Sequence, residues 1–327
     1  MIEVKNLVKK YGDHLAVNNL SFIIEPGKIY GFLGPNGAGK STTMNIITGY
    51  LAATEGQVLI NGHDIYEEPE AAKKCIGYLP ELPPLYMDMT PREYLEFASD
   101  LKGIKKSEKR AKIDEVVRMT GIEEVFNRLI KNLSKGYKQR VGLAQAILGF
   151  PEIIILDEPT VGLDPKQIIE IREVIKKLGK QHTVILSTHI MQEVSAVCDE
   201  VMIIAKGELV AKDTPNNLGK HIQGSNTIEA LVQAPDYKVK AILNKMEHIH
   251  KFEVYNVPEE NCVKAVITTG MEYDVREPLF YACAAAKCPI VGMQASEMSL
   301  EDVFIKVTGS GSDARKGKTV NVKKGTK

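Results

Sequence analysis

The stretch that decides the fold of this chain is Gly34-Pro35-Asn36-Gly37-Ala38-Gly39-Lys40-Ser41. It matches the pattern G-x-x-x-x-G-K-[ST], which wraps phosphate groups when it lies between a strand and a helix. The apolar run at residues 29–33 precedes it, and residues 42–47, beginning with Thr42, can continue as a helix. In such a loop backbone N–H groups converge on phosphate oxygens at a helix N-terminus. Residues 34–42 therefore predict a nucleotide-phosphate site.

Four further side chains carry the chemistry expected around this loop. Lys40 supplies a positive charge to the β- and γ-phosphates, and the Ser41 hydroxyl can ligate Mg²⁺. Asp157 and Glu158 end the apolar run at residues 153–156. Because the carboxyl ends of parallel strands line the ligand crevice, we expect Asp157 to hold Mg²⁺. Glu158 is then placed to orient and deprotonate the attacking water.

Residues 1–222 alternate between apolar strands and helical stretches, which predicts an α/β fold. Several of the runs are continuously apolar, as is typical of strands buried on both faces of a parallel sheet. The segment from Thr90 to Glu93 predicts a helix start with a capping threonine and a proline at the first helical position. We expect strands at residues 2–4, 20–24, 29–33, 58–60, 76–79, 153–157, 183–187 and 201–204.

A second, smaller unit is expected at residues 223–308. Its predicted order is β-α-β-β-α-β, the order of a split β-α-β unit of the α+β class. The strands are expected at 227–232, 251–256, 263–268 and 289–295, and the helices at 237–247, 275–287 and 300–307. Residues 309–327 hold six basic residues against one acid and few apolar ones, which predicts a disordered basic tail. That tail either contacts anionic lipid or is simply solvated.

The composition excludes several classes of protein. Among the 327 residues, lysine plus arginine and aspartate plus glutamate each total 42, so the net charge is zero and we expect no specific nucleic-acid partner. Five irregularly spaced cysteines do not form a disulfide framework and favour a reducing, cytosolic compartment. The apolar runs are shorter than the roughly 18 residues of a membrane helix. The N-terminus lacks the apolar core of a signal peptide, so we expect a chain that does not cross a membrane by itself.

Residues 133–140, Leu-Ser-Lys-Gly-Tyr-Lys-Gln-Arg, complete a set of motifs that resembles the nucleotide-binding subunits of ABC transporters over residues 1–222. Ser134 and Gly136 match the Ser and Gly of the family signature. Lys135 and Tyr137 stand where the family usually has Gly and Gln, a variant that resembles drug and antibiotic exporters. The resemblance implies an ABC-type P-loop NTPase domain with a helical subdomain, ATP and Mg²⁺ as cofactors, and ATP hydrolysis.

The resemblance also implies roles for residues outside the phosphate loop. Tyr11 matches the aromatic residue that stacks on adenine, Asp164 matches the loop after the carboxylate pair, and His189 matches the switch histidine. Glu81 stands where the family usually has Gln. A glutamate there keeps an oxygen ligand for Mg²⁺ but adds a negative charge close to the γ-phosphate.

The family mechanism implies partners for this chain. Two such domains form a head-to-tail dimer, as a homodimer or with another ATPase subunit, and Ser134 and Gly136 contact the γ-phosphate held by the other subunit. A separate integral-membrane permease, at the cytoplasmic face of the membrane, carries the cargo. Residues 298–304 either resemble the closing helix of the extension found in exporter ATPases or form a capped amphipathic helix that merely closes a small domain. The variant signature together with the extension favours export. We expect the permease to dock on the exposed apolar segment at residues 82–91, the alternative being a loop that folds back on its own helical subdomain.

Two other functions compete with transport: a soluble ATPase that acts on ribosomes or DNA, and a small-molecule kinase or GTPase. Soluble relatives that act on ribosomes carry two such domains in one chain, whereas this sequence has one phosphate loop. Relatives that act on DNA interrupt the domain with a long coiled coil, and no such insertion lies between Gly34 and Ser134. A small-molecule kinase or GTPase would lack the signature that precedes Asp157 and Glu158.

Overall fold

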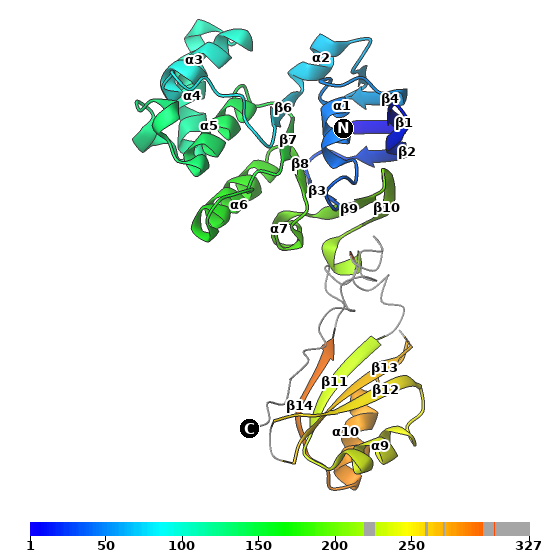
Figure 1. Cartoon of the computed structure of the whole chain (residues 1–327). Helices are drawn as coiled ribbons and strands as arrows, with labels where there is room; N and C mark the ends of the chain where they lie inside the picture. The colour runs from blue at the N-terminus through cyan, green and yellow to red at the C-terminus, as the bar shows by residue number, and fades with distance from the viewer. Residues whose placement is uncertain (219–225, 259–260, 271, 297–303, 305–327) are drawn as a thin grey trace, which may run out of the picture. The chain divides into compact units, whose positions relative to one another are not determined.

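The computed structural model describes residues 1–218, 226–258, 261–270, 272–296 and 304 (Figure 1). The described chain forms two compact units that divide between Pro215 and Asn216. The predicted tail at 309–327 lies outside the described residues, and so does the predicted closing helix at 300–307 apart from Phe304. None of the described helices combines the length and apolar character needed to span a membrane.

The first unit is built on a six-stranded sheet with the order β10-β9-β3-β8-β7-β6. All neighbours are parallel except β10, which pairs antiparallel with β9. Every residue of β3, β7 and β8 is buried, as their apolar runs predicted. The strands are β3 (Ile29–Leu33), β6 (Ile76–Leu79), β7 (Ile153–Asp157), β8 (Thr183–Thr188), β9 (Glu200–Ala205) and β10 (Glu208–Asp213).

Two apolar cores flank this sheet, one on each face. Ile153 and Ile155 of β7 pack into one core, and Ile154 and Leu156 pack into the other. This alternation follows from the two-residue repeat of a strand, which sends successive side chains to opposite faces. Both faces are therefore covered, and the ligand crevice is left at the carboxyl edge of the parallel strands.

An antiparallel sheet with the order β2-β1-β4-β5 lies beside helix α1 (Figure 1). Strands β1 and β2 form a hairpin longer than predicted, in which Tyr11 pairs with His14 and Gly12 takes a positive φ of 56°. This hairpin brings Tyr11 toward the phosphate loop. The strands are β1 (Ile2–Tyr11), β2 (His14–Ile24), β4 (Glu55–Ile60) and β5 (His63–Asp64).

Helices α3, α4 and α5 gather away from the antiparallel sheet and form a helical subdomain (Figure 1). The predicted cap at the start of α3 is present, because Glu93 N donates to Thr90 Oγ1 at 3.3 Å and Thr90 N donates to Glu93 Oε2 at 2.8 Å. The helices of the first unit are α1 (Lys40–Ile47), α2 (Pro69–Lys74), α3 (Pro91–Leu101), α4 (Lys106–Thr120), α5 (Lys135–Ile147), α6 (Pro165–Gly179) and α7 (Met191–Val197), with 3-10 turns at Glu123–Val125 and Ile130–Asn132.

The second unit has the predicted β-α-β-β-α-β order, and its four strands form an antiparallel sheet with the order β12-β13-β11-β14. Helices α9 and α10 cover one face of this sheet, where Ile228, Ile267 and Leu279 share a core (Figure 1). The elements are β11 (Asn226–Val232), α9 (Asp236–Leu243), β12 (Ile249–Asn256), β13 (Val263–Thr269), α10 (Arg276–Ala285) and β14 (Ile290–Ser296).

Gly77 of β6 sets how closely helix α5 packs on the sheet. A Cβ added at Gly77 would overlap the carbonyl oxygen of Ala146 and lie 2.8 Å from Pro151 Cγ. Because a backbone oxygen cannot rotate away, we expect Gly77→Ala to lower the free energy of unfolding by about 1–3 kcal/mol. Urea unfolding measures this change.

Gly292→Ala in β14 is the control for the Gly77 experiment. Its added methyl group would meet only Leu231 Cβ, at an ordinary 3.8 Å. We therefore expect the control to change the unfolding free energy by less than about 0.5 kcal/mol. A Gly77→Ala protein with the wild-type unfolding midpoint would contradict the packing argument.

Candidate nucleotide-binding site

The phosphate loop joins β3 to α1 through glycines that no other residue could replace without strain. Gly37 and Gly39 have φ angles of 78° and 100°, which glycine adopts freely. A Cβ at Gly39 would lie 2.5 Å from the carbonyl oxygen of Ala16, and one at Gly34 would lie 2.5 Å from that of Ile204. The loop is therefore packed closely against neighbouring backbone, which limits the conformations open to it.

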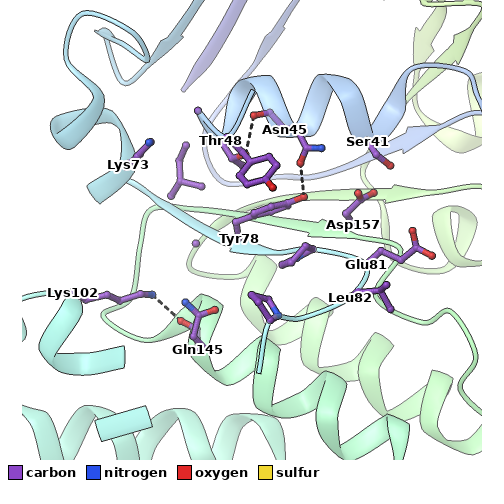
Figure 2. Close-up of a pocket in the computed structure, with 16 residues that line it drawn as sticks. Ser41, Asn45, Thr48, Lys73, Tyr78, Glu81, Leu82, Lys102, Gln145 and Asp157 are labelled. Atoms are coloured by element: carbon purple, nitrogen blue, oxygen red, sulfur yellow. Dashed lines mark hydrogen bonds between the residues drawn. The ribbon is translucent and has the colours of Figure 1, made fainter. Parts of the chain in front are cut away.

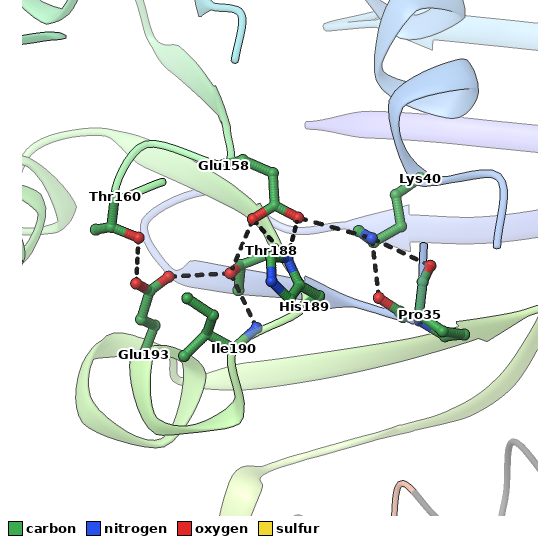
Figure 3. Close-up of polar contacts among 9 residues, drawn as sticks. Pro35, Lys40, Glu158, Thr160, Thr188, His189, Ile190 and Glu193 are labelled. Atoms are coloured by element: carbon green, nitrogen blue, oxygen red, sulfur yellow. Dashed lines mark hydrogen bonds and ion pairs between the residues drawn. The ribbon is translucent and has the colours of Figure 1, made fainter. Parts of the chain in front are cut away.

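Lys40 is buried at the centre of this loop. Its Nζ donates to the carbonyl oxygens of Gly34 at 2.8 Å and Pro35 at 3.3 Å, and lies 3.7 Å from Glu158 Oε1 (Figure 3). Burial lowers the pKa of Lys40, while the nearby carboxylates of Glu158 and Asp157 act in the opposite direction. A phosphate group would offer this ammonium a full negative charge in place of carbonyl dipoles.

One cavity of about 430 Å³ gathers most of the predicted nucleotide residues. Gly34, Pro35 and Ala38 of the predicted loop do not line it, and the Ala38 side chain is buried in the core. His14, Ala16 and Val161 also line the cavity, and no sequence signal identified them. The predicted residues that line it are Tyr11, Asn36, Gly37, Gly39, Lys40, Ser41, Thr42, Glu81, Glu158 and His189.

Three oxygen-bearing side chains lie together beside this cavity; Ser41 and Glu81 line it, whereas Asp157 does not. The Ser41 hydroxyl and the carboxylates of Asp157 and Glu81 lie near one another in Figure 2. Asp157 is buried, its Oδ1 has no hydrogen-bond partner among the described residues, and burial raises its pKa. An unpartnered buried carboxylate oxygen beside a hydroxyl and a second carboxylate fits the all-oxygen ligand set that Mg²⁺ takes.

Glu158 and His189, far apart in the sequence, come together at the carboxyl edge of β7 and β8. His189 Nδ1 lies 2.9 and 3.0 Å from the two carboxylate oxygens of Glu158 (Figure 3). Glu158 also has a φ of 48°, a left-handed conformation that is unusual for a residue other than glycine. Backbone strain of this kind concentrates at functional sites, where the surrounding structure enforces it.

Ser134, Gly136 and Asp164 lie apart from the phosphate loop of the same chain, and none of them lines the 430 Å³ cavity. Ser134 caps α5 by accepting from Tyr137 N at 3.3 Å, and Asp164 caps α6 by accepting from Gln167 N at 2.9 Å. A Cβ at Gly136 would lie 2.7 Å from the Gln167 side chain. Within one chain these residues therefore build helix N-termini and do not contact the phosphate loop.

Comparison with known proteins identifies the family. The sequence pattern of the family described as ABC transporter matches residues 17–161. The chain is 36% identical over 315 residues to the uncharacterized ABC transporter ATP-binding protein YhcH of Bacillus subtilis, covering 94% of this chain and 96% of that protein. This chain belongs to the ABC transporter ATP-binding proteins. The predicted family is confirmed, and the chain is an ATP-hydrolysing subunit of a transporter.

Other relatives of this ABC subunit have names that state a cargo or a resistance. The bacitracin transport ATP-binding protein BcrA of Bacillus licheniformis is 34% identical, covering 95% of this chain and 98% of that protein. The linearmycin resistance ATP-binding protein LnrL of Bacillus subtilis is 32% identical over 94% of this chain and 98% of its own length.

Solved ABC cassettes confirm the predicted fold class. An ATP-binding subunit of an ABC transporter aligns with a TM-score of 0.62 and 32% identity, covering 68% of this chain and 92% of that structure. The cassette MJ0796, solved as a dimer in a post-hydrolysis state with ADP and phosphate, aligns with a TM-score of 0.60 and 29% identity over 65% of this chain and 98% of its own.

A second cavity of about 810 Å³ adjoins the nucleotide cavity of this ABC subunit. Ser41 and Glu81 line both cavities. At its wall Tyr78 donates to Asn45 of α1 at 3.1 Å, and Lys102 Nζ donates to the Gln145 carbonyl at 2.8 Å (Figure 2). The cavity thus lies between the helix that carries Ser41 and the helical subdomain.

Proposed function

We propose that this subunit drives a separate integral-membrane permease in an exporter and lies peripherally at the cytoplasmic face of the membrane. The observation that carries the proposal is the similarity to the bacitracin transport protein BcrA over 95% of this chain. A match of that length runs past residue 222 into the second unit, whereas the solved cassettes cover 68% and 65% of the chain.

The chemistry we propose follows from the positions of the phosphate loop, of three carboxylates and of His189. Lys40 and the N–H groups of the loop bind the β- and γ-phosphates of ATP, and Glu158 accepts a proton from the attacking water. Ser41, Asp157 and Glu81 are the residues that would hold Mg²⁺, which neutralises charge on the phosphate oxygens when it is bound. His189 holds the Glu158 carboxylate at its 2.9 Å contact and faces the same cavity.

The dimer we propose explains why the signature residues lie away from the phosphate loop. Ser134 and Gly136 stand at the N-terminus of α5, where unpaired N–H groups and the helix dipole attract an anion. A second subunit, identical or different, brings its own γ-phosphate to this end. The dimeric form of the solved cassette MJ0796 supports the arrangement.

The function is tested by expressing the chain with and without a candidate permease. We expect membrane association that survives high salt, and stimulation of ATP hydrolysis, only when the permease is present. Salt-resistant association in membranes that lack the permease would contradict the proposal, because the chain would then hold the membrane by itself.

The docking site we propose for the permease is the segment at residues 82–91 beside the 810 Å³ cavity. Leu82 is 77% exposed and Met87 is 45% exposed, whereas Leu85 and Met89 are partly buried against the core of the helical subdomain. Tyr86 packs edge-on against Phe97 with ring centres 5.5 Å apart. The segment is therefore anchored by some side chains and presents others to a partner.

Met87→Asp is expected to uncouple the subunit from its permease. A charge on an apolar docking surface leaves a desolvated carboxylate without a partner, so co-purification should fall about tenfold or more while basal ATP hydrolysis stays unchanged. Val210→Asp on the edge strand β10 is the control, because Val210 is 44% exposed and lies on another surface. If both proteins bind and respond to the permease equally, the docking surface lies elsewhere.

A further inference from the structure

A buried carboxylate that the proposed chemistry does not use lies behind Glu158 and His189. Glu193, in the first turn of α7, is only 1% exposed. Its two oxygens accept hydrogen bonds from the hydroxyls of Thr160 and Thr188 (Figure 3). Burying a carboxylate is costly, and two neutral hydroxyls offset that cost less well than a cation would. The free-energy cost of burying Glu193 therefore suggests that this carboxylate has a role in the site.

The two threonines are the residues that follow the active strands. Thr160 comes two residues after Glu158, beyond the end of β7, and Thr188 is the last residue of β8, directly before His189. Glu193 therefore ties together the chain segments that carry the two predicted catalytic side chains. Neither threonine contacts the nucleotide cavity, since neither lines it.

The Thr188 hydroxyl has a single hydrogen to donate, and two carboxylates lie within hydrogen-bond distance of it. Its oxygen lies 3.0 Å from Glu193 Oε2 and 3.4 Å from Glu158 Oε2, and it accepts from Ile190 N at 3.1 Å. A hydroxyl can donate only once, so the shorter contact takes the hydrogen. Glu158 then keeps its lone pairs for His189 and for the attacking water.

We propose that Glu193 is a positioning residue for ATP hydrolysis. It takes the Thr188 hydrogen and fixes Thr160 and Thr188 to each other, so that Glu158 stays a hydrogen-bond acceptor facing the cavity. This inference rests on the proposed role of Glu158 as the base. It assigns Glu193 no contact with ATP, so its loss should affect the rate of hydrolysis and leave nucleotide binding unchanged.

Glu193→Gln is the first test, because the amide keeps the shape but brings an NH₂ group. The new NH₂ group must donate to the hydroxyl oxygen of one of the two threonines. If it faces Thr188, the Thr188 hydroxyl can no longer donate to residue 193 and turns its hydrogen toward Glu158. We expect kcat for ATP hydrolysis by the full chain to fall about 10–100-fold, with KM for ATP within about twofold of wild type. The thermal midpoint and the ATP affinity of the same preparation show whether the protein is folded.

A double-mutant cycle separates positioning from simple packing. Thr188→Val removes the hydroxyl and should lower kcat about tenfold, whereas Thr188→Ser, which keeps it, should restore the wild-type rate. In the Thr188→Val background, Glu193→Gln should lower kcat by less than about threefold. Thr183→Val, at the opposite end of β8, removes a buried hydroxyl that accepts from Gly27 N, and it should leave kcat unchanged.

The inference is overturned if Glu193→Gln hydrolyses ATP at the wild-type rate. It is also overturned if Glu193→Gln lowers kcat by the same factor in the wild-type and the Thr188→Val backgrounds. If Glu193→Gln does not fold, Thr188→Val and Thr188→Ser provide the test. Equal rates of ATP hydrolysis for these two variants would overturn the inference. Glu158→Gln is assayed alongside. Near-normal turnover in that variant removes the proposed base, whereas an inactive Glu158→Gln with a fully active Glu193→Gln removes only the positioning role.

Discussion

Glu158→Gln is expected to bind ATP with near wild-type affinity while its rate of hydrolysis falls about 10²–10⁴-fold. The amide has the shape of the carboxylate, so it can remain in its buried position beside His189, but it cannot accept a proton from water. Because the γ-phosphate then stays in place, the protein should accumulate as an ATP-bound dimer. Single-turnover hydrolysis and size-exclusion chromatography with ATP and with ADP measure both effects.

Glu152→Gln is the matched control for this experiment. Glu152 directly precedes β7, as Glu158 follows it, but it is exposed and accepts a hydrogen bond from Asn61 at 2.8 Å. We expect wild-type hydrolysis from the control. Near-normal turnover in Glu158→Gln would show that another group accepts the proton.

Lys40→Ala is expected to abolish tight ATP binding. The ammonium is the charged donor at the centre of the loop, and charge-assisted hydrogen bonds contribute about 1.5–3 kcal/mol each. Losing contacts to two phosphates should therefore weaken ATP affinity by on the order of 100-fold or more. Equilibrium titration with ATP at constant Mg²⁺ measures the change.

The control for Lys40→Ala is Lys74→Ala on α2, which removes an exposed lysine of the same charge. It should leave ATP affinity within about twofold of wild type, since exposed charges at a distance are screened. Tight binding retained by Lys40→Ala would mean that the backbone N–H groups hold the phosphates without the side chain.

The buried strands could be predicted from the sequence because burial on both faces leaves a continuous apolar run. The bounds of β3, β6 and β7 agree with the prediction residue for residue. Strands β5 and β10 were missed for physical reasons. The first has two residues, and β10 alternates half-exposed and exposed side chains, so neither shows an apolar run.

The site was predictable where its residues share a motif and not where the sheet order brings them together. Lys40 and Ser41 follow from a local pattern, and Asp157 and Glu158 from the end of one strand. The contact of Glu193 with Thr160 exists only because β7 and β8 are neighbours in the sheet, which no local spacing encodes. His14 reaches the cavity because it lies at the turn of the β1–β2 hairpin. The polar residues of β1 gave no apolar run, so the full length of this hairpin could not be predicted.

Ser41 and Glu81 form a shared wall between the nucleotide cavity and the larger cavity beside it. A partner side chain entering the larger cavity and a γ-phosphate entering the smaller one would therefore both meet these two residues. Thermodynamic linkage makes such an arrangement reciprocal. Whatever factor a docked partner imposes on the affinity for ATP, bound ATP imposes the same factor on the affinity for the partner.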